Sequence, residues 1–82
     1  MYHLYILKCA DGTLYTGITV DLERRIAEHN NSKLGAKYTS ARRPVELVYS
    51  ASFDNRSDAS REECRIKKLT REGKIELIRK GN

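Results

Sequence analysis

The sequence lacks the features that mark disulfide-bonded, zinc-binding and membrane proteins. Its two cysteines, Cys9 and Cys64, form no C-x-x-C pair, and no group of cysteines and histidines has the spacing of zinc ligands. No apolar run approaches the roughly 20 residues that span a membrane. The N-terminus also lacks the separate charged and apolar regions of a signal peptide. We therefore expect a soluble, cytoplasmic protein with two reduced cysteines packed in its core.

Repeats, low-complexity tracts and linkers are absent as well, and the 82 residues suffice for one small domain, residues 1–82. Lysine and arginine number 16 against 11 aspartates and glutamates, which gives a net charge of +5. This excess favours a polyanionic partner such as nucleic acid. One segment has four cations and no acid, and we expect it to bind phosphates through Lys33, Lys37, Arg42 and Arg43.

The hydrophobic pattern predicts an α+β fold, in which a three-stranded antiparallel sheet has flanking helices in the order ββαβαα. Patterns of period two predict strands over residues 2–8, 13–19 and 45–53. In the last of these strands, every second residue from Val45 to Phe53 is predicted to share one face.

Capping residues and apolar spacing predict the helices. They are expected from Asp21 to about Asn31, from 58 to 70 with Ser57 or Asp58 as the cap, and from 71 to 80 with Thr70 as the cap. Residues 32–44 have no clear period and are interpreted as a long loop that can hold a turn of helix. A loop of this length in so small a domain favours a role in function.

The hairpin between the first two strands decides whether Tyr5 and Tyr15 can meet. A two-residue turn puts the two phenols on opposite faces of the sheet, because side chains alternate along a strand. A three-residue loop over 10–12 instead pairs Leu7 with Tyr15 and Tyr5 with Gly17, so both phenols share one face. Such loops commonly end in a left-handed residue, which the glycine at position 12 supplies. In that register Gly17 leaves room beside Tyr5 for a substrate backbone.

The first predicted helix carries an inward-facing arginine and histidine. At about 100° per residue, Leu22 and Ile26 define its apolar stripe. Arg25 and His29 lie together along one edge of that stripe, whereas Arg24 points nearly the opposite way. Arginine suits bidentate phosphate binding, and histidine exchanges a proton near neutral pH. The spacing is equally compatible with residues that only frame the core, as the strand pattern is with half-buried tyrosines.

Cleavage of a phosphodiester near neutral pH usually also needs a metal ion, and such an ion needs an anionic oxygen ligand. The second predicted helix offers Glu62 and Glu63, which flank an apolar stripe of Ala59, Ile66 and Leu69. The helical wheel does not choose between the two carboxylates. Either of them can instead be the salt-bridge partner of a nearby arginine.

Taken together, these residues resemble the GIY-YIG nuclease superfamily. The resemblance rests on Tyr5 with Ile6-Leu7, on Tyr15-Thr16-Gly17, and on Arg25 and His29 in the helix that follows. The later segment Arg61-Glu62-Glu63-Cys64-Arg65-Ile66-Lys67-Lys68-Leu69-Thr70 resembles that of small YhbQ-like bacterial proteins and places the family's metal-binding glutamate at Glu63. The departures are His3-Leu4 for Gly-Ile in the first motif, Thr16 for Ile in the second, and Ile18 where many members carry a cation.

The resemblance implies a metal-dependent endonuclease that hydrolyses DNA phosphodiester bonds, in DNA repair or recombination. It implies that Glu63 holds one Mg²⁺ or Mn²⁺ ion and that Tyr5, assisted by His29, is the general base toward water. Arg25 would neutralise charge on the developing phosphorane, and Tyr15 would position water or phosphate. A phenol is a poor base near pH 7, so Tyr5 needs help from the metal, from Arg25 or from hydrogen bonds.

Two other functions are open on the same fold. The cations of residues 33–43, together with Arg61, Arg65 and Lys68, suit a nucleic-acid-binding module without catalysis. A small interaction subunit is the second alternative. Family members that select a DNA site or structure generally carry an extra recognition domain, which these 82 residues do not include. As a nuclease, the chain is expected to cut branched, nicked or single-stranded DNA weakly, or to need a protein partner.

Overall fold

The computed structural model describes residues 1–31 and 37–81. Its strands are β1 (Tyr2–Lys8), β2 (Leu14–Thr19) and β3 (Glu46–Phe53), and its helices are α1 (Leu22–Asn31), α2 (Lys37–Ser40), α3 (Arg56–Lys67) and α4 (Arg71–Gly81). The strands form one antiparallel sheet in the order β2-β1-β3, which confirms the predicted α+β fold. The short helix α2 lies in the segment predicted as a loop. Among these residues, none of the helices combines the length and apolar character that a membrane span requires.

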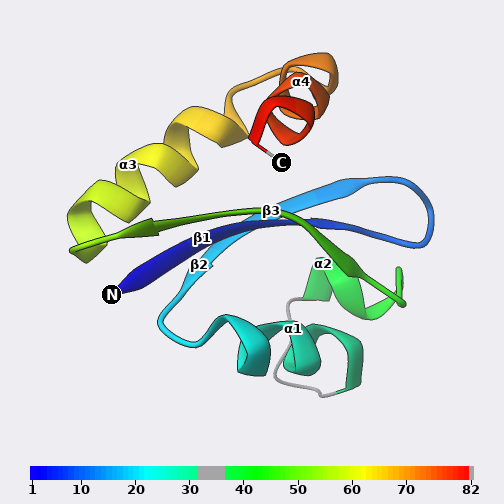
Figure 1. Cartoon of the computed structure of the whole chain (residues 1–82). Coiled ribbons are helices and arrows are strands. Elements are labelled where there is room, and N and C mark those ends of the chain that lie inside the picture. Colours follow the sequence, from blue (N-terminus) through cyan, green and yellow to red (C-terminus); the bar gives the residue numbers. More distant parts are fainter. Residues whose placement is uncertain (32–36, 82) are drawn as a thin grey trace.

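The central strand β1 is buried on both faces. Leu4 and Ile6 pack with Ile66 of α3 on one face, and Tyr5 and Leu7 pack toward α1 on the other. Figure 1 shows the corresponding layers, with α1 and α2 on one side of the sheet and α3 and α4 on the other. Successive side chains of a strand point to opposite faces, so the middle of a central strand between two helical layers is apolar on both faces.

The hairpin between β1 and β2 has the register on which the two tyrosines depend. Leu7 pairs with Tyr15, and Tyr5 pairs with Gly17. Gly12 ends the connecting loop with a φ angle of 85°, in the left-handed region that glycine adopts without strain. The three-residue loop is therefore confirmed, and both phenols lie on the face of the sheet that α1 covers.

Strand β3 departs from the predicted alternation. Its pairing with β1 slips by one residue between Ile6 and Leu7, as at a β-bulge. The extra residue, Val48, packs in the same apolar cluster as Tyr49, whereas Val45 packs in the cluster on the other face of the sheet. The prediction that every second residue of this strand shares one face is therefore wrong, because the bulge changes the phase of the alternation.

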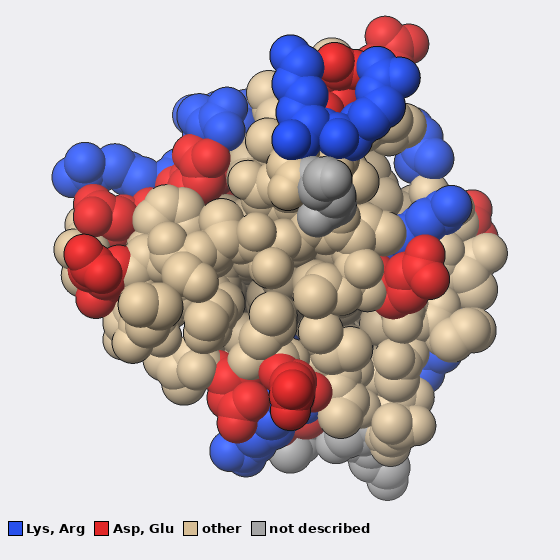
Figure 2. All heavy atoms as spheres, viewed as in Figure 1, with Lys and Arg blue, Asp and Glu red and all other residues tan. Residues whose placement is uncertain are grey.

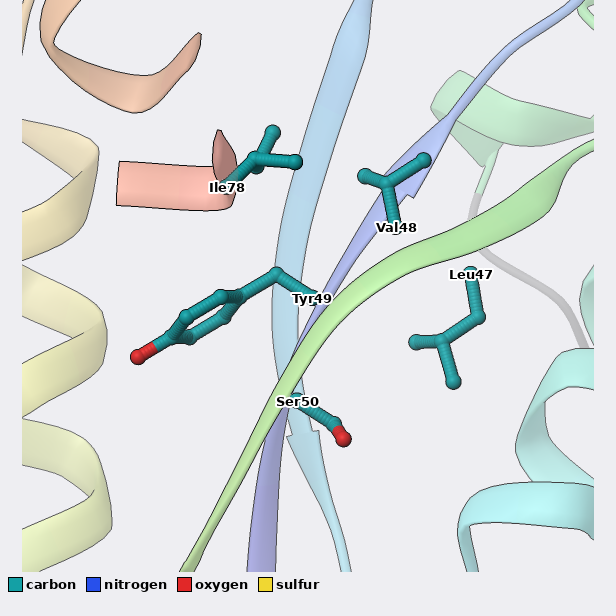
Figure 3. A pocket seen from close by; sticks show the side chains of 5 residues that line it. All are labelled: Leu47, Val48, Tyr49, Ser50 and Ile78. Carbon is teal, nitrogen blue, oxygen red and sulfur yellow. The ribbon is translucent and has the colours of Figure 1, made fainter. Parts of the chain in front are cut away.

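At the bulge, β3 and α4 enclose a hollow of about 370 Å³, lined by Leu47, Val48, Tyr49, Ser50 and Ile78. Figure 3 shows Tyr49 and Ile78 on the side of β3 that faces α3 and α4, and Leu47 on the side that faces α1. In Figure 2 the centre of this face consists of uncharged residues, and lysines and arginines gather over α4 at the top of the view. The hollow therefore contains none of the groups that the sequence selects for chemistry.

The two C-terminal helices begin at polar caps. The amide of Asp58 donates to the side-chain oxygen of Asn55 at 2.9 Å, so Asn55 is the N-cap of α3. The prediction of Ser57 or Asp58 as the cap is therefore wrong. The amide of Gly73 donates to the hydroxyl of Thr70 at 3.1 Å, which confirms Thr70 as the cap of α4.

The two cysteines have different environments. Cys9 is buried beside the end of β1, as predicted, whereas Cys64 is exposed on α3. The buried residues of α3 are Ala59 and Ile66, and Cys64 lies nearly opposite them on the helix. The prediction of a core position for Cys64 is therefore wrong.

Candidate active site

Tyr5, Tyr15 and His29 form a compact aromatic cluster between the sheet and α1. The ring centroids of Tyr5 and Tyr15 are 6.5 Å apart, those of Tyr5 and His29 are 5.8 Å apart, and those of Tyr15 and His29 are 5.2 Å apart. The hairpin register brings the phenols to this face, and the helical period brings the imidazole to it. The structure therefore places three of the sequence-predicted site residues together.

The phenol of Tyr5 lies on the backbone of Gly17. A β-carbon at position 17 would lie 2.5 Å from the phenol oxygen, and Tyr5 is only 1% exposed. The room that Gly17 leaves is thus filled by the Tyr5 ring itself. The expectation that this space would admit a substrate backbone is wrong, because the glycine accommodates the phenol and not the substrate.

A buried chain of hydrogen bonds continues from Tyr5. Its hydroxyl lies 3.0 Å from Nε2 of His29, and Nδ1 of His29 lies 2.7 Å from the hydroxyl of Thr39 in α2. Both His29 and Thr39 are completely buried. Sequence reasoning missed Thr39, because it lies in the segment without a hydrophobic period and no motif marks it.

Burial keeps both members of the Tyr5–His29 pair neutral at pH 7. It raises the pKa of Tyr5, an effect that a hydrogen bond from Arg25 partly offsets and the negative charge of Glu63 adds to. Burial, and then the positive charge of Arg25, lower the pKa of His29 to about 4. Tyr5 therefore holds its proton, and His29 is available as a proton acceptor.

Arg25 is the arginine of α1 that faces this cluster. Its side chain is 27% exposed, against 73% for Arg24, which confirms the predicted orientation of the two. Arg25 hydrogen-bonds the phenol of Tyr5 and forms an ion pair with Glu28 at 3.0 Å. Glu28 also pairs with Arg24 at 3.2 Å. Sequence reasoning missed Glu28, although its spacing of three and four residues from the two arginines is the signal for such a pair.

The two candidate carboxylates of α3 have different partners. Glu62 accepts two hydrogen bonds from Arg65, at 2.7 and 2.6 Å, and is thereby held within its own helix. Glu63 forms an ion pair with Lys67 at 3.1 Å, and its charge acts on the phenol of Tyr5. Helix α3 packs against β2, the edge strand that carries Gly17, so Glu63 lies within electrostatic range of the aromatic cluster.

A single carboxylate restricts the kind of metal site that the chain can form. Within residues 1–31 and 37–81, no three side chains of His, Cys, Asp or Glu come together as a ready metal site. Mg²⁺ commonly binds through one or two carboxylates, several waters and the phosphates of its substrate. Glu63, which is 22% exposed, fits such a hydrated ion, whereas a closed zinc site does not fit these residues.

The cations predicted to bind phosphates are only partly within the described residues. Lys33 and the side chain of Lys37 lie outside them. Arg42 pairs with Asp11 of the hairpin at 3.0 Å, and Arg43 donates to carbonyl oxygens at the end of α1. Both arginines therefore tie the segment that contains α2 to its neighbours.

The GIY-YIG catalytic domain family matches residues 1–76 of this chain. A UPF0213 protein of Staphylococcus saprophyticus is 51% identical over 80 residues, which cover 98% of this chain and 96% of the relative. A UPF0213 protein of Halobacterium salinarum is 54% identical over 78 residues, or 95% and 100% of the two chains. The solution NMR structure of the UPF0213 protein BH0048 from Bacillus halodurans has a TM-score of 0.64 and 44% identity, covering 100% of this chain and 88% of that one. The NMR structure of the E. faecalis protein EF2693 has a TM-score of 0.67 and 41% identity, covering 96% of this chain and 83% of that one.

Proposed function

This chain belongs to the GIY-YIG catalytic domain family, and from that premise we propose that it is a metal-dependent endonuclease that hydrolyses DNA phosphodiester bonds. In this proposal, residues 1–82 form a single nuclease domain that acts in DNA repair or recombination. The observation that carries it is the convergence of two phenols, a guanidinium and a neutral imidazole in one cluster. Few other tasks need a proton acceptor and a phosphate-binding cation side by side.

Arg25 and Tyr15 are the groups that substrate meets first, since both are only partly buried. The guanidinium of Arg25 binds the scissile phosphate and stabilises the charge that develops on it, a role commonly worth about 3 to 4 kcal/mol in the transition state. Tyr15 borders the same cluster and positions the water or the phosphate.

Tyr5 is the proton acceptor for the attacking water. As the water oxygen bonds to phosphorus, the bond between phosphorus and the leaving oxygen breaks. One proton of the water passes to the phenol oxygen, and the phenol passes its own proton to Nε2 of His29, 3.0 Å away. Two short transfers of this kind avoid a free tyrosinate, which the burial of Tyr5 strongly disfavours. The neutral state of His29 is essential to this relay.

Glu63 would hold one Mg²⁺ or Mn²⁺ ion, which when bound stabilises negative charge on the leaving oxygen. The carboxylate itself must stay ionised and accessible for this purpose. Its ion pair with Lys67 is partly exposed, and such pairs contribute about 0 to 1 kcal/mol, so a divalent cation can replace the lysine.

The test compares Glu63→Gln with Glu62→Gln, two neighbouring carboxylates on one helix. Each variant is assayed against branched, nicked, single-stranded and duplex DNA and matching RNAs, with Mg²⁺, with Mn²⁺ and with chelator. We expect Glu63→Gln to abolish metal-dependent cleavage and Glu62→Gln to keep it. Equal cleavage by Glu63→Gln and the wild type would contradict the metal assignment, and no cleavage of any substrate by the wild type would contradict the nuclease proposal.

A nucleic-acid-binding module without catalysis is the second candidate, and the burial of Tyr5 favours it, because a general base must reach water. For that function, DNA binding would be independent of metal and would weaken steeply with salt. Binding of this kind by a wild type that never cuts would select the second candidate over the first.

A further inference from the structure

We infer that Thr39 is a positioning residue, whose hydroxyl accepts the Nδ1 hydrogen of His29 and so orients the ring with Nε2 toward the proton of Tyr5. The tautomer follows from the hydrogen bonds themselves, and its catalytic consequence rests on the proposed function.

The argument begins at the hydroxyl of Tyr5, which has one hydrogen to donate. Within residues 1–31 and 37–81, its side-chain hydrogen-bond partners are Arg25 and Nε2 of His29. A guanidinium only donates, so it cannot receive the phenol hydrogen. The hydrogen of Tyr5 is therefore directed at His29, and Nε2 must be the unprotonated nitrogen of the ring.

A neutral imidazole carries a single hydrogen, which must then be on Nδ1. That hydrogen points at the hydroxyl of Thr39, 2.7 Å away. With the opposite tautomer, both Nε2 and Arg25 would donate to the oxygen of Tyr5, and the buried phenol hydrogen would have no acceptor among the described residues. A buried donor without an acceptor keeps the full penalty of its desolvation, which disfavours that tautomer.

The position of Thr39 is fixed by bonds that do not involve His29. The amide of Arg42 donates to the carbonyl oxygen of Thr39 at 3.0 Å, and the carbonyl oxygen of Arg42 accepts from the amide of Ala10 in the hairpin at 2.9 Å. The short helix is therefore attached to the same hairpin that carries the tyrosines. This attachment lets one hydroxyl of α2 orient a ring on α1.

The test is nitrogen-15 NMR of the histidine side chains, in which protonated and unprotonated ring nitrogens have clearly separated shifts. His3 is the only other histidine in the sequence and supplies an internal reference. We expect His29 of the wild type and of Thr39→Ser to carry its hydrogen on Nδ1. Thr39→Val removes the hydroxyl at nearly constant shape, so the Nδ1 hydrogen of His29 loses its bond to that hydroxyl. We expect the Nδ1 shift of His29 to change while the signals of His3 stay unchanged.

The cleavage assay adds a second readout. We expect Thr39→Val to lower kcat at least about 10-fold with little change in KM, and Thr39→Ser to restore it, because proton transfer and not phosphate binding is affected. A wild-type His29 with its hydrogen on Nε2, or an unchanged Nδ1 shift in folded Thr39→Val, would overturn the inference, and the wild-type spectrum decides it even if the valine variant does not fold. A wild type that never cuts DNA would refute the proposed function and leave the NMR result standing.

Discussion

The ring of Tyr5 occupies the space that the missing side chain of Gly17 leaves on β2, so the two residues act as one unit. A β-carbon on Gly17 would lie 2.5 Å from the phenol oxygen and 2.6 Å from the carbon that bears it. The glycine of the Tyr15-Thr16-Gly17 motif is therefore required by the tyrosine of the paired strand. Because Gly17 has no side chain, the phenol oxygen of Tyr5 can lie against the backbone of β2.

Gly17→Ala should accordingly displace the phenol of Tyr5 from His29. Overpacking of a tightly filled site typically destabilises a protein by about 1 to 3 kcal/mol, which denaturant unfolding will measure. Cleavage activity should fall with the loss of the Tyr5–His29 hydrogen bond. Gly73→Ala is the matched control, because a β-carbon there would lie at an ordinary 3.4 Å from its nearest neighbours. Wild-type stability and cleavage activity in Gly17→Ala would contradict the proposed packing.

The adjacent arginines of α1 should differ sharply in their effect on cleavage. Arg25→Ala removes the guanidinium that hydrogen-bonds Tyr5, and we expect kcat to fall by about 10²- to 10³-fold. Arg24→Ala removes a side chain that is 73% exposed, and we expect activity within about 2-fold of the wild type. Similar losses in both variants would mean that the helix contributes only general positive charge.

The stability of the protein should depend on pH through His29. Its pKa is about 4 when folded and 6.5 in the reference state, so between these values the unfolded chain binds a proton that the folded chain excludes. The free energy of unfolding should therefore be constant above about pH 6.5 and decrease as the pH falls toward 4, by about 3 kcal/mol in total.

Two histidine variants separate this effect from the titration of carboxylates. His29→Gln should lose most of the slope between pH 6.5 and 4.5, whereas His3→Gln should retain it. Asp11, Glu28 and Glu62 have lowered pKa values because of their hydrogen-bonding and charged partners, so their stabilisation is lost only at still lower pH. A pH-independent wild type in this window would show that His29 is protonated in the folded protein.

Thr16 is buried, and its hydroxyl has no hydrogen-bond partner among the described residues. Thr16→Val replaces the hydroxyl with a methyl group, and we expect it to stabilise the protein by about 1 kcal/mol. Thr19→Val is the control, because the hydroxyl of Thr19 bonds the backbone of Asp21, and its loss should destabilise. Thermal unfolding of the two variants should shift in opposite directions, and destabilised Thr16→Val protein would point to a water-bound hydroxyl.

The N-cap of α3 gives a further comparison. Asn55→Ala removes the side-chain oxygen that accepts from the amide of Asp58, and should cost about 1 kcal/mol of stability. Ser57→Ala lies within the helix on an exposed position and should be neutral or slightly stabilising. If Ser57→Ala destabilised the protein more than Asn55→Ala, the N-cap of α3 would be Ser57, one of the two residues that the sequence predicts.

Periodic features of this chain were predictable from the sequence. The period of two, with a glycine at the end of the loop, favoured the three-residue loop and so the shared face of Tyr5 and Tyr15, which the structure confirms. The period of 3.6 distinguished Arg25 from Arg24. Both arguments use geometry that every strand or helix obeys, so they needed no knowledge of the partners.

Features that depend on a partner were not predictable in this way. The sequence of β3 alternates regularly through Val48 and gives no sign of a bulge. The one-residue slip is visible only in the pairing of β3 with β1. The filled space over Gly17 depends on where the ring of Tyr5 turns. Thr39 is a candidate site residue only because its hydroxyl bonds His29, which lies on a different helix. The effect of the Glu63 charge on the phenol of Tyr5 likewise depends on how α3 packs against the sheet.

Glu63 belongs to neither of the two apolar clusters of the core, and it projects from a helix that does not carry the aromatic rings. On the proposed mechanism, a single substitution there removes hydrolysis while the sheet, the hairpin and the phosphate-binding groups remain intact. On that mechanism, cutting and binding without cutting differ by one carboxylate on α3, which lies outside both apolar clusters.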